Sequence, residues 1–90
     1  MTIEVRIPTI LRQYTDGANS VVGAGDTLSE LLGDLDVRHP GLADRLVENG
    51  TLRRFINVYV NDEDVRFLGG LATPLTDGDQ VTVLPAVAGG

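Results

Sequence analysis

Three stretches of the chain alternate between apolar and polar residues, and this period of two predicts half-buried β-strands. The stretches span residues 2–8, 55–60 and 80–84, and the second has the clearest pattern. Two shorter segments, residues 19–22 and 64–67, predict further strands, and the second of these is expected at a sheet edge. In the three clear strands, the side chains expected to face the core are those of Ile3, Val5, Ile7, Ile56, Val58, Val60, Val81 and Val83.

The middle of the chain changes to a helical period. Thr27 and Glu30 have the spacing of a capping box, in which both side chains satisfy free backbone amides at the start of a helix. The apolar stripe of this helix comprises Leu28, Leu31, Leu32 and Leu35. The helix is expected to end before His39, because Pro40 excludes its predecessor from helical geometry. One or two further helical turns are predicted at residues 42–47.

The predicted order is strand, strand, helix, strand, short strand and strand, with no repeat or linker. We therefore expect one domain over residues 1–90. Asp77 and Gly78 predict a tight turn before the last strand, because glycine readily adopts a positive φ. Strands of both directions on one main helix make an α+β fold with a mixed sheet of four to five strands. A right-handed crossover that places the first and last strands side by side gives the β-grasp, or ubiquitin-like, arrangement.

The last six residues follow the final predicted strand and are expected to form a flexible, reactive tail. They are Pro85, Ala86, Val87, Ala88, Gly89 and Gly90. The two glycines are slender because they lack Cβ atoms, so such an end can pass through a narrow channel in a partner enzyme. The carboxylate of Gly90 is then the group that the partner would transform. A frayed end without function has the same sequence, and the tail alone does not decide between the two interpretations.

Composition narrows the classes of function. Thirteen acidic residues against seven basic ones give a formal net charge of -6, which offers no attraction to nucleic acid or to an anionic membrane. Cysteine is absent, so the chain itself supplies no thiol for catalysis and no disulfide. No apolar run approaches the ~20 residues of a membrane span, and the start of the chain lacks the pattern of a secretory signal. A cytoplasmic protein is therefore expected.

An exposed apolar patch is predicted beside the tail. If Val81 and Val83 face the core, Leu84 points outward just before the tail, where it can dock a partner. Phe55 and Tyr59 are expected to share that outer face through the neighbouring strand. Alternatively, a loop covers these side chains, or they belong to the scattered apolar residues of any protein surface. We favour the patch as a partner-binding site.

Other polar residues predict no site. The acidic run at residues 62–64 lacks the glycine and the distal glutamate of a calcium loop, so it is interpreted as a solvated turn that can attract an arginine-rich partner. His39 has no catalytic companion at a suitable spacing, which favours a turn residue over a base. Gly69 and Gly70 lack the lysine and hydroxyl residue of a phosphate loop. No metal site is expected.

Several motifs together resemble a known family. They are the terminal Gly89 and Gly90, the turn "TDGD" at residues 76–79 and the following "VTVLPAVAGG". With "IPTILR" near the start and "NVYVNDEDVRFLGGLATPL" at residues 57–75, the whole chain resembles the ubiquitin-like sulfur carriers of the ThiS and MoaD type. Within that family, the resemblance is greatest to the carriers that serve cysteine biosynthesis.

The resemblance implies a function that ends at the tail. By analogy with the family, an activating enzyme adenylates the carboxylate of Gly90 with ATP, and the carboxylate is then converted to a thiocarboxylate. The sulfur would pass to an acceptor derived from O-phosphoserine on a cysteine synthase that depends on pyridoxal phosphate (PLP). A zinc metallopeptidase would release the cysteine. ATP, PLP and zinc would belong to these partners, and the chain would be a protein co-substrate with no cofactor of its own, not an enzyme.

Three alternatives stay open at this point. The chain could be a small subunit of molybdopterin synthase or a sulfur carrier for thiamin. It could also be a non-catalytic ubiquitin-like interaction module that stays docked to one partner. Finally, it could be a protein modifier that forms amides with lysines on its targets. The chain has no lysine of its own, so it offers no side-chain amine for linkage to further copies of itself.

Overall fold

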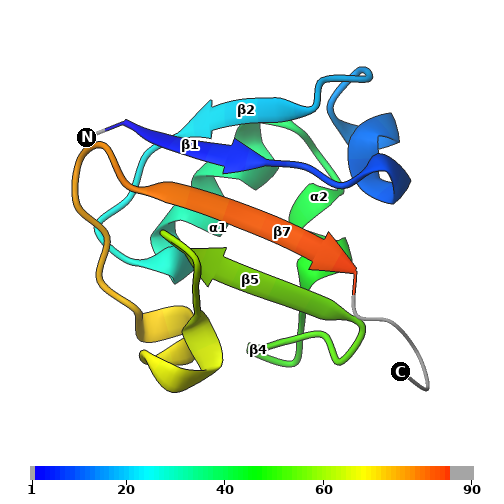
Figure 1. Ribbon diagram of the computed structural model, residues 1–90. Helices are drawn as coiled ribbons and strands as arrows, with labels where there is room; N and C mark the ends of the chain where they lie inside the picture. The colour runs from blue at the N-terminus through cyan, green and yellow to red at the C-terminus, as the bar shows by residue number, and fades with distance from the viewer. Residues whose placement is uncertain (1, 86–90) are drawn as a thin grey trace.

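Residues 2–85 are described by a computed structural model, in which five strands form one mixed sheet (Figure 1). The strand order is β2-β1-β7-β5-β6, and these strands span, in that order, Ser20–Gly23, Ile3–Arg6, Gln80–Pro85, Ile56–Val60 and Glu63–Asp64. β1 and β7 pair in parallel in the middle of the sheet, while the other pairs of this sheet are antiparallel. The predicted position of the first and last strands is confirmed, and the fold is a β-grasp.

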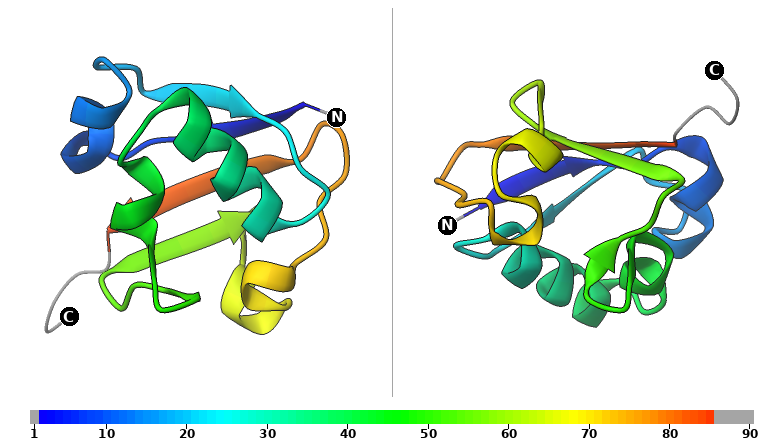
Figure 2. Two further views of the ribbon diagram at one scale, coloured as in Figure 1. Left: turned by 180° about the vertical axis from the view of Figure 1, so that it is seen from behind. Right: turned by 90° about the horizontal axis from the view of Figure 1, so that it is seen from below.

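Two helices cover one face of the sheet. Figure 2 shows α1 (Leu28–Arg38) and α2 (Leu42–Leu46) on the same side, so that the molecule has two layers. The register places Val81 beside Val5 on one side and beside Val60 on the other, which directs alternate apolar residues of three strands into one core. All eight predicted inward side chains of the clear strands are buried. Burying each such side chain contributes on the order of 1.5–3 kcal/mol to folding.

Helix α1 begins and ends where the sequence predicts. The hydroxyl of Thr27 accepts a hydrogen bond from the backbone N–H of Glu30 at 3.2 Å. The carboxylate of Glu30 accepts from the N–H of Asp26 at 2.9 Å, so the reciprocal bond of the capping box reaches one residue further back. His39 caps the other end, and its N–H donates to the carbonyl of Leu35 at 2.7 Å.

A hairpin replaces part of the predicted second helix, and this prediction was wrong at Val47. α2 ends at Leu46, and β3 (Val47–Glu48) pairs with β4 (Thr51–Leu52). Asn49 and Gly50 connect the two strands with φ of 53° and 78°. A two-residue Asn-Gly loop with positive φ at both positions matches the twist of a β-hairpin, so it reverses the chain at that point.

The short strand predicted at residues 64–67 does lie at the edge of the sheet, as β6 (Glu63–Asp64), but its predicted bounds were wrong. β6 ends at Asp64, and a 3-10 helix, η2 (Val65–Phe67), follows directly. The carboxylate of Asp64 accepts a hydrogen bond from the N–H of Arg66 at 2.9 Å, which satisfies a free amide at the start of this turn. A second 3-10 turn, η3 (Gly70–Ala72), begins at the glycine pair, with Gly69 as the residue before its first turn.

No regular element was predicted for residues 9–14, yet they form the 3-10 helix η1 (Thr9–Tyr14). The N–H of Leu11 donates to the carbonyl of Pro8 at 3.0 Å, and Leu11 is the buried residue of this helix. A short helix with one buried side chain leaves no repeating apolar stripe, so periodicity did not reveal it.

The carboxylate of Asp34 links α1 to the end of β2. It accepts hydrogen bonds from the N–H of Ala24 at 2.9 Å and from Nε of Arg38 at 2.8 Å. The backbone bond from Ala24, assisted by Arg38, holds the pKa of Asp34 below its ordinary value, against the opposing effect of desolvation. A depressed pKa in the folded state means that the stabilisation is present above the unfolded-state pKa of about 3.9 and is lost as the pH falls through the folded-state pKa.

The substitution Asp34→Asn is expected to lower the free energy of unfolding at neutral pH. On acidification, the variant should lose less stability than wild type. The neutral amide of asparagine lacks the negative charge that strengthens the two hydrogen bonds. The variant therefore has no carboxylate at this position whose protonation would lower the stability of the fold. Urea unfolding between about pH 6 and about pH 2.5 measures both effects. Asp62→Asn, which removes a carboxylate from an exposed turn, is the control. Equal pH dependence of wild type and Asp34→Asn would contradict this role.

Candidate functional site

The candidate site surrounds the point where the described chain ends, at Pro85. β7 lies between β1 and β5, and Pro85 is still paired in register with Ile56. The backbone is therefore held by the sheet up to its last described residue. Of the predicted tail, Ala86, Val87, Ala88, Gly89 and Gly90 lie outside the described residues.

Leu84 and Tyr59 lie together on the outer face of the sheet. Val81 and Val83 are buried, so Thr82 and Leu84 point away from the helices, and Leu84 is 45% exposed. Tyr59 pairs in register with Thr82 on the neighbouring strand. These three side chains and Asp62 line a depression of about 240 Å³. An apolar residue and an aromatic ring therefore meet beside the root of the tail.

Phe55 lies elsewhere. It precedes β5, which begins at Ile56, and the N–H of Ile56 donates to the carbonyl of Arg53 at 3.1 Å in a turn. The alternation of the strand therefore does not extend back to Phe55. Phe55 is 69% exposed and lines a different depression, with Ile10 and Tyr14 of η1. The structure does not bring it together with Leu84 and Tyr59.

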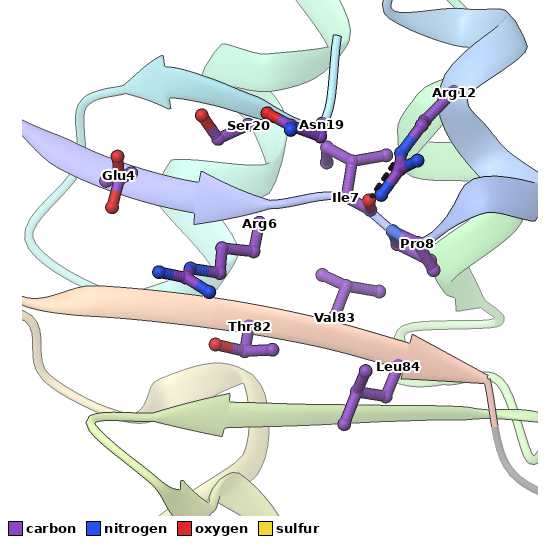
Figure 3. A pocket seen from close by; sticks show the side chains of 10 residues that line it. All are labelled: Glu4, Arg6, Ile7, Pro8, Arg12, Asn19, Ser20, Thr82, Val83 and Leu84. Atoms are coloured by element: carbon purple, nitrogen blue, oxygen red, sulfur yellow. Dashed lines mark hydrogen bonds between the residues drawn. The ribbon is translucent and has the colours of Figure 1, made fainter. Parts of the chain in front are cut away.

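A larger depression on the outer face was not predicted from the sequence. It has a volume of about 420 Å³ and lies across β2, β1 and β7 (Figure 3). Arg6 enters it from the end of β1, and Thr82 and Leu84 enter it from β7. Arg12 of η1 completes it, and its Nε donates to the carbonyl of Ile7 at 3.1 Å. Two guanidinium groups beside the tail root can receive carboxylates of a partner.

The alternation of β1 already placed Arg6 on the outer face. The contribution of Arg12 depends on η1, which periodicity did not reveal. Within residues 2–85, neither of these arginines lies within 4.0 Å of a carboxylate oxygen.

The remaining polar groups have structural roles. His39 ends α1, and the acidic residues 62–64 form the turn into β6 and its short strand. In the part of the chain that the structure describes, no three or more histidine or acidic side chains are grouped as metal ligands. The helices of that part are too short or too polar to cross a membrane. The site therefore offers surfaces for recognition around the exit of the chain.

Known proteins resemble the chain over its whole length. The model of the ThiS family matches residues 5–90. Sulfur carrier protein CysO from Mycobacterium tuberculosis (strain ATCC 25618 / H37Rv) is 56% identical over 93 residues, with 100% of both chains covered. Small archaeal modifier protein 3 from Haloferax volcanii is 39% identical over 93 residues, also with 100% of both chains covered.

A solved structure shares the fold in detail. One chain in the crystal structure of the Amycolatopsis orientalis BexX/CysO complex has a TM-score of 0.93 and 57% sequence identity. The match covers 98% of the present chain and 99% of that chain. The relative was therefore crystallised with a partner protein, and its similarity extends over nearly all of both chains.

Proposed function

Because this chain belongs to the ThiS family, we propose that it is a sulfur carrier for cysteine biosynthesis, with the carboxylate of Gly90 as the group that accepts sulfur. The observation that carries this proposal is the full-length similarity to CysO, at 56% identity. The family match continues through the two terminal glycines. The protein is a small carrier and not a catalyst, so the chemistry is performed on it by partner enzymes.

The chemistry follows from the reactivity of a carboxylate. A carboxylate is a poor electrophile until one of its oxygens becomes part of a good leaving group. In the activating enzyme, an oxygen of Gly90 attacks the α-phosphorus of ATP, forms the acyl adenylate and releases pyrophosphate. A sulfide-level sulfur nucleophile then forms the C–S bond and displaces AMP, which leaves a thiocarboxylate. That anion is nucleophilic at neutral pH and stays attached to the carrier.

The fold supports this role by holding the root of the tail. β7 is bonded on both sides, by β1 and by β5, up to Pro85. Gly89, without a Cβ, keeps the approach to Gly90 narrow enough for a channel. The tail residues Ala86, Val87 and Ala88 supply the reach between the rigid strand and the reacting carboxylate.

Three partner classes complete the proposal. An activating enzyme that uses ATP prepares the thiocarboxylate, and a cysteine synthase that depends on PLP takes the sulfur. The sulfur adds to the acceptor while it is still bonded to the carbonyl carbon of Gly90, which gives a thioester of cysteine. The cysteine amine then attacks that carbonyl and displaces the thiolate, so the acyl group shifts from sulfur to nitrogen. A zinc metallopeptidase hydrolyses the resulting amide, which releases cysteine and restores the carboxylate of Gly90. The BexX/CysO complex of Amycolatopsis orientalis supports the view that carriers of this kind dock to a protein partner.

An exchange assay tests the proposal. The chain is mixed with its activating enzyme, ATP and labelled pyrophosphate, and label entering ATP reports reversible adenylation. We expect exchange that depends on the carrier. Exchange that is equally fast without the carrier, or absent with it, would contradict the proposal.

The similarity to small archaeal modifier protein 3 favours one second candidate, a modifier that is joined to lysines of other proteins. Its signature is a ladder of lysine-linked conjugates in the native cells. A docked subunit would instead co-purify stably with one large partner.

Leu84 is expected to contribute to docking of the activating enzyme. Leu84→Ser removes an apolar side chain beside the tail root, and the loss of such an interface contact, about 1.4 kcal/mol, lowers kcat/KM for adenylation about tenfold. The control is Phe67→Ser, which removes an 88% exposed apolar side chain from η2. Thermal unfolding confirms that both variants are folded. Equal kcat/KM for Leu84→Ser and the control would show that the activating enzyme does not use Leu84.

A further inference from the structure

Arginines and carboxylates are unevenly distributed along the molecule. The parallel strands β1 and β7 end at the same edge of the sheet, and the antiparallel β5 begins there (Figure 1). Five of the seven basic residues lie in β1, η1 and α2 or just before β5, around this exit of the chain. They are Arg6, Arg12, Arg45, Arg53 and Arg54. The end from which the tail leaves is therefore rich in arginine, although the chain carries a net charge of -6.

The opposite end carries a cluster of carboxylates. Its acidic residues lie in the turn and strand after β5 and in the turn before β7, and they are Asp62, Glu63, Asp64, Asp77 and Asp79. Nδ2 of Asn61 donates to the carboxylate of Asp79 at 2.9 Å, which joins the two turns. The two ends of the molecule along β7 therefore differ in charge: the five arginines lie at the tail end, together with the carboxylates of Asp44 and Glu48, and the five carboxylates of β6 and the two turns lie at the opposite end.

A groove of about 400 Å³ lies at the arginine-rich end, between η1, α2 and the turn before β5. We call it the arginine groove. Ile10 and Phe55 are 59% and 69% exposed and give it apolar walls. Arg45 and Arg53 give it positive charge. It is separate from the outer-face depressions that contain Leu84.

Both arginines of the groove are held in place by the fold. The guanidinium of Arg45 lies 5.5 Å from the centre of the Tyr14 ring, and its Nε donates to the hydroxyl of Tyr14. Nε of Arg53 donates to the carbonyl of Asp44 at 2.7 Å, and its guanidinium also forms an exposed ion pair with the carboxylate of Glu48 at 3.5 Å, which a partner's carboxylate would share or replace. Fixed guanidinium groups lose little freedom when they bind carboxylates, so the groove is organised for anionic side chains.

We propose that the arginine groove binds an acidic segment of the activating enzyme. An apolar side chain of that segment lies between Ile10 and Phe55, and its carboxylates pair with Arg45 and Arg53. This inference rests on the proposed function, because an enzyme that takes Gly90 into its active site must face the end from which the tail leaves. The activating enzyme is the first partner to do so. Nucleic acid also binds arginine, but the net charge of -6 opposes its approach.

The uneven distribution of charge has a kinetic consequence. An acidic partner surface attracts the arginine-rich end and repels the acidic end, so it orients the carrier with its tail forward. Such steering raises association rates by roughly 10- to 1,000-fold at low ionic strength and weakens as salt screens the charges. Adenylation at low carrier concentration is therefore expected to slow as salt is added.

The test compares two double variants with equal net charge. Arg45→Gln/Arg53→Gln removes two positive charges from the groove, and Ser29→Glu/Ala72→Glu adds two negative charges at exposed positions in the first turn of α1 and in η3, at the opposite end of the molecule. We measure kcat/KM for adenylation at about 20 mM and about 500 mM salt, where the Debye length falls several-fold. The groove variant is expected to lose at least about tenfold at low salt and much less at high salt. The control is expected to stay within about twofold of wild type at both, because its added charges lie outside the docking end.

A third variant isolates the apolar wall. Phe55→Ser is expected to lower kcat/KM at both salt concentrations without changing its salt dependence, because no charge is altered. Thermal unfolding checks that each variant is folded. If wild type is activated and the groove variant behaves like its control, the arginine groove is not a binding site, while the sulfur carrier function stands. If wild type itself is not adenylated, both proposals are wrong.

Discussion

Removal of Gly90 is expected to abolish activation of the carrier and to leave its thermal unfolding unchanged. The shortened chain still ends in a carboxylate, but that carboxylate stops one residue short, about 3.3–3.6 Å from its proper position. A misplacement of about 1 Å can already cost ~100-fold in a positioned reaction. The rate of adenylation should therefore fall by more than about 100-fold. The folded sheet ends at Pro85, so stability should not change.

The same reasoning applies to Gly89→Ala, which adds a Cβ to the narrow approach and should slow adenylation while a carboxylate remains in place. Ser29→Ala, at an exposed position of α1, is the control for handling and folding. Exchange of pyrophosphate into ATP gives the rate. If the chain without Gly90 gained sulfur at the wild-type rate, the proposed role of the tail would be wrong.

Leu31→Ala is expected to destabilise the protein severely. Leu31 lies on the buried stripe of α1 and is 0% exposed. Its side chain lies close to Gly23 at the end of β2, where an added Cβ would approach its Cδ1 to 2.8 Å. Removing a fully buried leucine side chain costs about 2.7–5 kcal/mol, because the lost apolar contacts are accompanied by a cavity. A small domain has a total stability of only about 5–15 kcal/mol.

Urea unfolding measures this effect as a lower midpoint with little change in slope. The control is Val37→Ala on the same helix, where the side chain is 81% exposed and the expected change lies within about 0.5 kcal/mol. A loss below about 1 kcal/mol for Leu31→Ala would contradict the placement of this side chain in the core.

The main elements could be predicted because each has a repeated local signal. The stripe from Leu28 to Leu35 and the cap at Thr27 define α1, and the alternation around Val58 and Val83 defines the two strands that hold the tail root. Burial on one face imposes these patterns, so they can be read without the structure. The central pairing of β1 with β7 then followed from the handedness of the crossover.

The errors occurred where single hydrogen bonds decide the local structure. Residues 64–67 alternate between polar and apolar side chains as a strand does. The strand nevertheless ends at Asp64, because the carboxylate of Asp64 accepts a hydrogen bond at the start of the 3-10 helix η2. Val47 continues the helical spacing of apolar residues in α2. The two-residue loop of Asn49 and Gly50 reverses the chain, however, so Val47 pairs with β4 as part of a β-hairpin. The Asn-Gly dipeptide is a sequence signal for such a hairpin, and the prediction of helical turns at residues 42–47 did not use it.

The site could be predicted in part. Leu84 and Tyr59 meet because alternation fixes the outward face of paired strands. Phe55 lies outside the regular strand, so the same argument did not hold for it. The arginine groove could not be predicted, because it depends on how η1, α2 and the turn before β5 come together. Such contacts join residues that are far apart in the sequence and leave no local pattern.

The intact mass of the protein isolated from its native cells tests the central claim most directly, with C-terminal fragments sequenced by mass spectrometry. A sulfur carrier for cysteine biosynthesis should have sulfur in place of one oxygen at Gly90, or an added cysteine at that residue. An unmodified carboxylate that also stays inert with ATP and an activating enzyme would contradict the carrier function and favour a subunit that stays docked in a larger enzyme.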